Sequence, residues 1–465
     1  MSIVARTPPR FHPLSGPLLL ATLVWLVGAE GTARAKGIPE PDNVLLITLD
    51  TLRADHLGVY GRRPSITPTL DRLAAEGTVF LDATCSMPTT LPSHLTLFTG
   101  LAPEQHGVWL NGVVPRPELR SVFEELEAGG RRTAAVVAAR VLEARYLAGL
   151  GFGEILDDGL GSERHQLPGE AIVERAETWL ATVGEEERFA LWLHFFDPHE
   201  PYDPEPAIAA PWVEDYDGPL GDSLGIDELL ALNEPQRQDD LSAEDRQHVS
   251  DLYAAEVVEL DRHLGRLLEV LEGRDLLERT LIVVVADHGQ ALGEQGHWGH
   301  GEWLLESIIK VPWIVRGPGV RVGRRVKTPV EAADLAPTLA QVFGFELPSD
   351  RRGRSLVPAL AGRRIPDSGP RVVLRRRYPQ EPRRFGITVL EGPLKWLYVR
   401  DSTGQHYRLG RRDGDGGLDG EDFFDPYDPA AREFHRRARD LDVPTQDPLL
   451  DAETLEMLRS LGYVQ

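Results

Sequence analysis

Continuous apolar runs recur between residues 44 and 315 and predict the strands of a buried sheet. These runs lack the alternation of apolar and polar residues that a half-exposed strand shows. They are typical of parallel strands that helices cover on both faces. The five runs are residues 44–49, 133–138, 189–196, 281–286 and 311–315.

Helical patterns fill the segments between these runs. Residues 69–76 and 243–271 repeat apolar residues at helical spacing, and glycines that commonly end helices, Gly77 and Gly273, follow them. Residues 169–183 show the same spacing. The alternation of strands and helices predicts an α/β fold with a doubly wound, mainly parallel sheet sandwiched by helices.

The composition changes after about residue 346, where arginines become frequent and apolar runs become short. We expect a smaller C-terminal α+β subdomain with an antiparallel sheet over residues 346–445, followed by a helical tail over residues 446–465. The arginines fit a solvated face paired with acids better than a site for an anionic substrate. The predicted strands are residues 371–374, 386–390 and 394–399, and the predicted loop is the glycine- and aspartate-rich segment 410–422.

The N-terminal residues have the features of a secretory signal peptide. Arg6 and Arg10 precede an apolar stretch at residues 18–27, and Ala33-Arg34-Ala35 follows as a cleavage site. The stretch is shorter than a helix that crosses a bilayer. We therefore expect residues 1–35 to be removed and the protein to be exported to the periplasm or the extracellular space. An uncleaved membrane tether is the alternative.

The charge and the cysteine count exclude several classes of function. The 73 acidic and 50 basic residues give a formal net charge of −23, which argues against nucleic acid as a partner because phosphate backbones bind clustered positive charge. The single cysteine, Cys85, excludes a disulfide within the chain and a structural zinc–thiolate site. Nothing in the sequence favours a particular oligomeric state.

Three of the five apolar runs end at an aspartate. These residues are Asp50, Asp197 and Asp287, and His199 and His288 follow two of them closely. Ligands of open α/β sheets bind beyond the carboxyl ends of the strands. Carboxylates and imidazoles at one such edge would suit a divalent metal ion. The alternative is that each aspartate only caps the turn or helix that follows.

A threonine precedes a predicted helix and completes the candidate site. Thr89 and Thr90 come before Pro92, which suits a first helical turn, and Gly100 ends the helix. A hydroxyl at a helix N-terminus would meet unpaired N–H groups and the positive end of the helix dipole, which favour anions. Bound to a metal ion, the Thr90 hydroxyl could attack phosphorus or sulfur. The alternative is a simple N-cap.

These segments resemble the sulfatases of the alkaline phosphatase superfamily. The resemblance spans residues 42–345 and implies a sulfatase-like catalytic domain there. Residues 423–426 and 458–463 resemble the tail of the family more loosely. In the order of the family, the matching segments are residues 43–55, 92–94 with 97–100, 197–202, 286–289 and 296–312.

The resemblance implies a metal centre. Asp50, Asp287 and His288 would hold a catalytic divalent ion, and the Thr90 oxygen would be a further ligand. Thr51 stands where sulfatases often supply a second polar ligand. The ion would be Ca, Mg, Mn or Zn.

The resemblance also implies a site for an anionic group. His199 matches the family histidine that contacts this group, and His300 stands where many sulfatases place a lysine on the substrate sulfate. Both would act in catalysis together with the threonine nucleophile. His297 is close to His300 in the sequence. With Asp197, these histidines would suit a second metal ion, so the protein would use one or two ions.

Two positions depart from the sulfatase pattern. Thr90 stands where sulfatases carry a Cys or Ser that is converted to formylglycine, and His94 stands in the place of an arginine. Threonine cannot form the formylglycine aldehyde because its Cβ carries a methyl group. Cys85 has the wrong spacing to replace it and is interpreted as a small core residue. Threonine nucleophiles occur in the same superfamily among nucleotide pyrophosphatase/phosphodiesterase and phosphonate-cleaving enzymes.

We therefore predict an exported, metal-dependent hydrolase that cleaves phosphate mono- or diesters through a covalent phospho-Thr90. Its substrate would be a small-molecule, glycan or lipid ester. Three alternatives stay open. They are a sulfuric ester hydrolase that acts without formylglycine, a transferase that passes the phosphoryl group to an alcohol, and a weakly active glycan-binding protein.

Overall fold

The computed structural model divides the chain into two units, and the described residues all belong to the unit that begins at Gly37. The expected signal peptide at residues 1–35 and the loosely matching residues 423–426 lie outside the described residues. Among the residues that are described, no helix is both long and apolar enough to cross a membrane. The structure describes residues 37–161, 165–376, 385–392, 394–401, 404–412, 418–419, 436 and 450–461.

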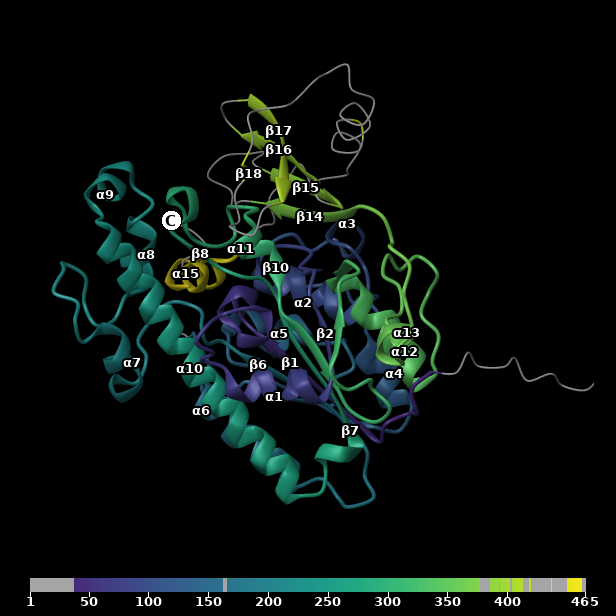
Figure 1. The fold of residues 1–465 in the computed structure, drawn as a ribbon. Coiled ribbons are helices and arrows are strands. Elements are labelled where there is room, and N and C mark those ends of the chain that lie inside the picture. Colours follow the sequence, from purple (N-terminus) through teal and green to yellow (C-terminus); the bar gives the residue numbers. More distant parts are fainter. Residues whose placement is uncertain are drawn as a thin grey trace, which may run out of the picture. The chain divides into compact units, whose positions relative to one another are not determined.

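A mainly parallel sheet of eight strands forms the core of this unit (Figure 1). Its order is β12-β2-β11-β7-β1-β6-β4-β5, and the strands from β7 to β5 are parallel. Every residue of β1, β6 and β7 is buried, which explains why these strands are uninterrupted apolar runs in the sequence. The predicted α/β fold is confirmed. The strands are β1 (Asn43–Leu49), β2 (Thr78–Phe80), β4 (Arg132–Val136), β5 (Glu154–Leu156), β6 (Phe189–Phe195), β7 (Thr280–Ala286), β11 (Trp313–Arg316) and β12 (Arg324–Val326).

The prediction of a fifth parallel strand at residues 311–315 is wrong. The run divides at Pro312, which has no N–H group for a ladder, into β10 (Lys310–Val311) and β11. β11 runs antiparallel to β7, with Trp313 opposite Val285. The only α-helix between β7 and β10 is α11 (Glu306–Ile309), which is too short to return the chain to the other end of the sheet. The next strand therefore begins at the edge where β7 ends.

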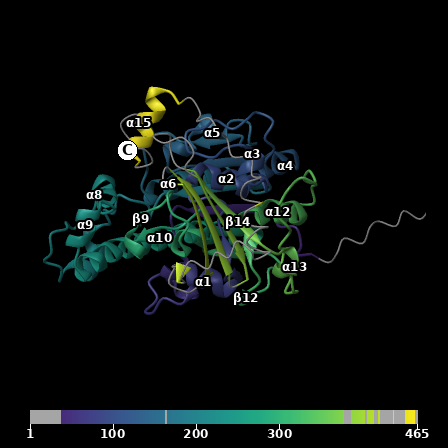
Figure 2. The ribbon, with the colours of Figure 1, turned by 90° about the horizontal axis from the view of Figure 1, so that it is seen from above.

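Helices flank the sheet in two groups (Figure 2). In one group, α1 (Pro68–Glu76) and α6 (Gly169–Ala181) pack against the long α10 (Ala243–Gly273). In the other, α4 (Val122–Ala128) and α12 (Leu335–Phe343) pack against α2 (Thr90–Thr99). The helices predicted at residues 69–76, 169–183 and 243–271 thus correspond to α1, α6 and α10. Each boundary is within about two residues of the prediction, the usual uncertainty of helix ends.

A separate antiparallel sheet of five strands follows, and it confirms the predicted small C-terminal sheet. The loop prediction for residues 410–422 is partly wrong, because β17 continues to Arg412 and β18 lies at Leu418–Asp419. Pairing with β16 supplies backbone hydrogen bonds that override the poor strand propensity of glycine and aspartate. The strands are β14 (Arg371–Arg376), β15 (Phe385–Glu391), β16 (Leu394–Asp401), β17 (Gly404–Arg412) and β18 (Leu418–Asp419).

The remaining described elements are short. β3 (Ala83–Thr84) pairs with β10 and β13 (Val330–Glu331), and β8 (Ala291–Leu292) pairs with β9 (Trp298–Gly299). The α-helices are α3 (Pro103–His106), α5 (Ala144–Leu147), α7 (Pro206–Val213), α8 (Ile226–Ala231), α9 (Pro235–Asp240), α13 (Val357–Leu360) and α15 (Ala452–Ser460), the last within the predicted tail. The 3₁₀ helices are Ala54–His56, Gly58–Tyr60, Arg140–Leu142, Leu277–Arg279, Glu294–Gly296 and Ala332–Asp334.

Candidate active site

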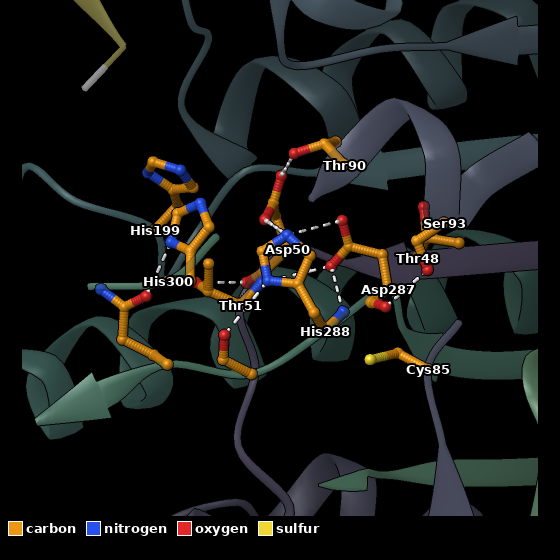
Figure 3. Close-up of polar contacts among 12 residues, drawn as sticks. Thr48, Asp50, Thr51, Cys85, Thr90, Ser93, His199, Asp287, His288 and His300 are labelled. Carbon is orange, nitrogen blue, oxygen red and sulfur yellow. Dashed lines mark hydrogen bonds and ion pairs between the residues drawn. The ribbon is translucent and has the colours of Figure 1, made fainter. Parts of the chain in front are cut away.

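Neighbouring strands bring two aspartates to one edge of the main sheet. Asp50 and Asp287 directly follow β1 and β7, which are paired in register up to Leu49 and Ala286. Thr90, the first residue of α2, lies beside them with its Oγ1 3.5 Å from Asp50 Oδ2 (Figure 3). The site therefore lies at the carboxyl ends of parallel strands, where open α/β sheets bind ligands.

Three ligand-type atoms converge at this edge. His288 Nε2 lies 3.8 Å from Asp50 Oδ1 and 3.5 Å from Asp287 Oδ2. Within the described part of the chain, these three buried atoms make no hydrogen bond, which is unfavourable unless a ligand lies between them. Ligand atoms about 2.1 Å from a tetrahedral ion are about 3.4 Å apart. The spacing and the mixed oxygen and nitrogen donors therefore fit one divalent metal ion.

The electrostatics of the two aspartates also fit a cation. Burial raises the pKa of Asp50, but the hydrogen bond with His194 and the charge of His199 outweigh burial and hold that pKa below its ordinary range. Burial and the nearby charge of Asp50 raise the pKa of Asp287 well above its ordinary value. Two carboxylates this close repel each other, and a bound cation would favour the ionised form of both.

Thr51 contributes to the site through its backbone. Its φ angle of 53° is rare for a β-branched residue, and this conformation directs its N–H group at Asp287 Oδ1, 3.3 Å away. Its hydroxyl donates to the Asp50 carbonyl (2.8 Å), and its own carbonyl accepts from Tyr253 (2.8 Å). The structure thus places Thr51 beside the metal-ligand group, with its hydroxyl bonded to the main chain.

The start of α2 differs from the sequence-based expectation of unpaired N–H groups. Leu91 N–H donates to Asn111 Oδ1 (2.8 Å), and Ser93 N–H donates to the Thr89 carbonyl (3.2 Å). Pro92, between them, has no N–H group. These three positions therefore offer no N–H group to an anion, while the helix dipole still favours negative charge there.

His194 is a part of the site that the sequence analysis missed. It lies in β6, opposite Thr48 of β1, and its Nε2 is 3.3 Å from Asp50 Oδ2. The Ala138 N–H group points at His194 Nδ1 (3.4 Å) and can only donate. Nε2 therefore carries the proton and donates to Asp50. The available signal was a single histidine inside an otherwise apolar strand beside the strand that ends at Asp50.

His94 lies behind Thr90 and is fully buried. Its Nδ1 is 2.8 Å from the Thr90 carbonyl oxygen and 3.7 Å from Asp287 Oδ2. Its Nε2 is 2.9 Å from Thr48 Oγ1. Burial, with a smaller contribution from His194, lowers the pKa of His94 to about 3. The residue that stands in the place of the sulfatase arginine is therefore neutral.

Two further histidines from different loops meet beside the metal-ligand group. The rings of His199 and His300 are 4.8 Å apart in an edge-to-face arrangement, and the rings of His288 and His300 are 4.5 Å apart. Burial and the neighbouring histidines lower the pKa of His300 well below its ordinary value. The structure therefore brings His199 and His300 together next to His288, as Figure 3 shows.

A buried network fixes which nitrogen of each ring carries the proton. Gln290 Nε2 donates to Glu200 Oε2 (2.7 Å), so Gln290 Oε1 faces His300 Nδ1 (2.9 Å) and accepts its proton. His199 Nδ1 donates to the Glu200 carbonyl oxygen (2.6 Å). Tyr202 accepts a further hydrogen bond from Gln290 (2.8 Å). The Nδ1 atom of each ring is therefore engaged as a donor within the protein.

Glu200 holds this network together, and the sequence analysis did not identify it. Its carboxylate lies 3.6 Å from His199 Nδ1 and 3.8 Å from His300 Nδ1. Because both Nδ1 atoms carry protons, Glu200 cannot share a metal ion with them through these atoms. It is the anionic partner of the two rings, and its only signal in the sequence is its position directly after His199.

Asp197 and His297 do not join this cluster. Asp197 Oδ2 faces Gly169 at the start of α6, on the side of His263 and Glu259, and burial raises the pKa of Asp197 to about 6. His297 stacks on Trp303, with ring centroids 3.6 Å apart. The placement of both residues beside His199 and His300 is therefore corrected. Asp197 packs against the helices, and stacking holds His297 on the indole.

Comparisons with known proteins show which family and which fold the chain shares. The sequence model of the Sulfatase family matches residues 42–345. Mouse (Mus musculus) steryl-sulfatase is 26% identical over 445 residues, which cover 76% of this chain and 70% of that protein. Among solved structures, a protein in complex with its substrate D-glucosamine-2-N,6-O-disulfate is similar with a TM-score of 0.70 at 18% identity, covering 91% of this chain and 98% of that one.

The phosphonate monoester hydrolase of Silicibacter pomeroyi is similar with a TM-score of 0.65 at 22% identity, covering 85% of this chain and 94% of that one. The family match includes more than half of the chain and every residue of the site described above. The protein therefore belongs to the sulfatase family of hydrolases, within the alkaline phosphatase-like superfamily.

Proposed function

We propose that the protein hydrolyses phosphate mono- or diesters with a divalent metal ion and with Thr90 as the nucleophile. The observation that carries the proposal is the Thr90 hydroxyl at the start of α2, 3.5 Å from Asp50 Oδ2 and beside the group of Asp50, Asp287 and His288. Cys85 is buried, and burial raises the pKa of its thiol well above the ordinary value, so Cys85 is a poor substitute nucleophile.

The residues support a two-step reaction. Asp50 Oδ2 accepts the hydrogen bond from the Thr90 hydroxyl and orients it for attack, and the proton of the hydroxyl passes to solvent. Oγ1 attacks phosphorus, the bond from phosphorus to the leaving alcohol breaks, and the leaving oxygen takes a proton from solvent. Water then attacks phospho-Thr90, the bond to Oγ1 breaks, and the hydroxyl is restored. A divalent ion held by the two aspartates and His288 would polarise the phosphoryl group and lower the pKa of the hydroxyl.

We further propose that His199 and His300 face the phosphoryl group and hold a second divalent ion. Each ring uses Nδ1 as a donor to the protein, so Nε2 is the atom of each ring that would bind the ion. Imidazole nitrogens are good ligands of transition metals. A second ion held by these two histidines would add positive charge that stabilises the transition state.

Hydrolysis of sulfuric esters without formylglycine is the second candidate. Its support is the family match and the sulfated substrate of the structural relative solved with D-glucosamine-2-N,6-O-disulfate. A sulfate ester carries less charge than a phosphate monoester and needs less compensation by cations. Sulfatase activity would therefore go with one bound ion, and phosphate monoesterase activity with two.

A substrate panel and two variants test the proposal. The metal-reconstituted enzyme should have a higher kcat/KM for an aryl phosphate or a bis-aryl phosphate than for an aryl sulfate. Thr90→Ala should lower kcat by about 10³-fold or more, and Thr90→Ser should keep part of the activity. Mass spectrometry after acid quench should find phosphate on Thr90. Turnover by Thr90→Ala near the wild-type rate would overturn the proposal.

Metal analysis separates the two candidates further. The wild type should bind two ions per chain, and His300→Ala should retain one. A single ion in the wild type would mean that the two imidazoles contact the substrate directly. The proposed substrate is a small-molecule, glycan or lipid ester, and we propose export after removal of residues 1–35. N-terminal sequencing of the secreted protein tests the cleavage.

A further inference from the structure

A chain of buried hydrogen bonds runs behind Thr90 from β6 through β1 to α2. Trp192 Nε1 donates to Thr48 Oγ1 (2.9 Å). Thr48 Oγ1 lies 2.9 Å from His94 Nε2, and His94 Nδ1 lies 2.8 Å from the Thr90 carbonyl oxygen. The side chains of all four residues are buried. The metal-ligand group and the histidine pair do not include this chain of bonds.

The two end groups of this series of hydrogen bonds determine which atom carries each proton. The Trp192 N–H group can only donate, so Thr48 Oγ1 accepts from it, and the Thr48 proton can point at His94 Nε2 when that nitrogen carries no proton. The Thr90 carbonyl can only accept, so His94 Nδ1 must carry a proton. Each donor therefore has one acceptor when His94 is neutral and protonated on Nδ1. If Nε2 carried the proton, this proton would face the Thr48 hydroxyl. The hydrogen of the hydroxyl would then lose Nε2 as its acceptor.

We infer that His94 is a positioning residue for the nucleophile, acting through the hydrogen bond from its Nδ1 to the Thr90 carbonyl. The inference rests on the proposed role of Thr90. His94 bonds to the main chain of Thr90 and not to its hydroxyl, so it orients the nucleophile without taking its proton. Because His94 lies one helical turn after Thr90, this bond fixes the first turn of α2 against β1. The neighbouring Asp287 Oδ2, 3.7 Å from Nδ1, links the same ring to the metal-ligand group.

Paired amide variants separate the two ends of the His94 ring. Asparagine places its amide N–H group near the position of Nδ1 and keeps the bond to Thr90. Glutamine reaches the position of Nε2 and keeps only the contact with Thr48. A displacement of the nucleophile of about 1 Å lowers the rate by about 10²-fold. We expect His94→Asn to keep kcat within about tenfold of the wild type, and His94→Gln to lose about 10²-fold in kcat with KM within about twofold.

His106 provides a matched control. It is also buried against α2, and its Nε2 lies 3.3 Å from Thr96 Oγ1, but it has no hydrogen bond to Thr90 among the described residues. His106→Asn and His106→Gln should lower the melting temperature without changing kcat. If the His94 variants do not fold, Thr48→Val removes the hydroxyl at nearly constant volume. This variant should lower kcat by about 3–10-fold, the effect of about 1 kcal/mol for one hydrogen bond.

The spectroscopic readout is the tautomer of His94. In protein labelled with ¹⁵N-histidine, His94 of the wild type should give the signature of a neutral ring protonated on Nδ1. Equal kcat values for His94→Asn and His94→Gln, or a ring protonated on Nε2, would overturn the inference. If Thr90→Ala keeps its activity, the proposed function itself fails. If Thr90→Ala is inactive while His94→Gln remains fully active, only the role of His94 fails.

Discussion

Asp287→Asn tests whether the two buried aspartates serve a metal ion at the expense of stability. In the metal-free protein, facing oxygens of Asp50 and Asp287 lie within 4.8 Å of each other. Asparagine keeps the oxygen that accepts the N–H groups of Thr51 (3.3 Å) and His288 (2.7 Å). Its amide places an N–H group where the second carboxylate oxygen faced Asp50. We therefore expect the metal-free variant to be more stable than the metal-free wild type.

The size of this effect follows from the separation of the charges. Two unit charges 4.8 Å apart repel each other by about 3.5 kcal/mol at an effective dielectric constant of about 20. The raised pKa of Asp287 means that a part of this repulsion is relieved by protonation, so the expected gain is about 1–3 kcal/mol. A chain of 465 residues has an unfolding entropy of about 1 kcal/mol/K, so the melting temperature should rise by about 1–3 °C.

Added metal should reverse which of the two proteins has the higher melting temperature. At a free metal concentration about 1,000 times Kd, the wild type gains about 4 kcal/mol, or about 4 °C in melting temperature. The variant lacks one of three ligands and should gain much less. Calorimetric scans should therefore give the higher melting temperature for Asp287→Asn in EDTA and for the wild type in MnCl₂ or ZnCl₂.

Asp334→Asn is the control for this experiment. Asp334 is a buried aspartate that accepts N–H groups of Glu331 (3.1 Å) and Arg354 (2.8 Å). Its replacement should leave the metal-induced shift in melting temperature unchanged. A lower melting temperature of Asp287→Asn than of the wild type in EDTA would refute the reasoning, because it would mean that the carboxylate stabilises the fold without a cation.

Two other variants test the surroundings of the site. His194→Phe removes the hydrogen bond to Asp50 Oδ2 (3.3 Å). Isothermal titration with MnCl₂ should therefore show a metal affinity about 10–100-fold lower than that of the wild type. An unchanged Kd would exclude a role of His194 in orienting Asp50. Burial raises the pKa of Asp334 to about 7, above the unfolded value of about 3.9, so the folded state binds more protons between these values. The contribution of protonated Asp334 to the free energy of unfolding is complete below about pH 4 and is lost as the pH rises to about 7. Between about pH 5 and about pH 8, urea denaturation should therefore show a larger decrease in the free energy of unfolding for the wild type than for Asp334→Asn. Equal decreases would contradict a raised pKa of Asp334.

The sequence by itself determined the elements and the positions from which the site is built. Buried parallel strands need apolar residues on both faces, so 44–49, 189–196 and 281–286 are recognisable as uninterrupted runs. Parallel strands end at one edge of the sheet, so the sequence places Asp50 and Asp287 at the same edge, and the pairing of β1 with β7 makes them neighbours.

Only the tertiary structure decided which side chains face one another. The direction of β11 depended on the absence of a crossover helix, and Asp197 turned toward α6 although its sequence position resembles that of Asp50. His194 and Glu200 contact the site from a strand interior and from a turn. A hydrogen bond depends on register and side-chain direction to within about an ångström, whereas a hydrophobic pattern records only burial. The apolar pattern therefore locates the strand ends, and the polar network around them follows from packing in three dimensions.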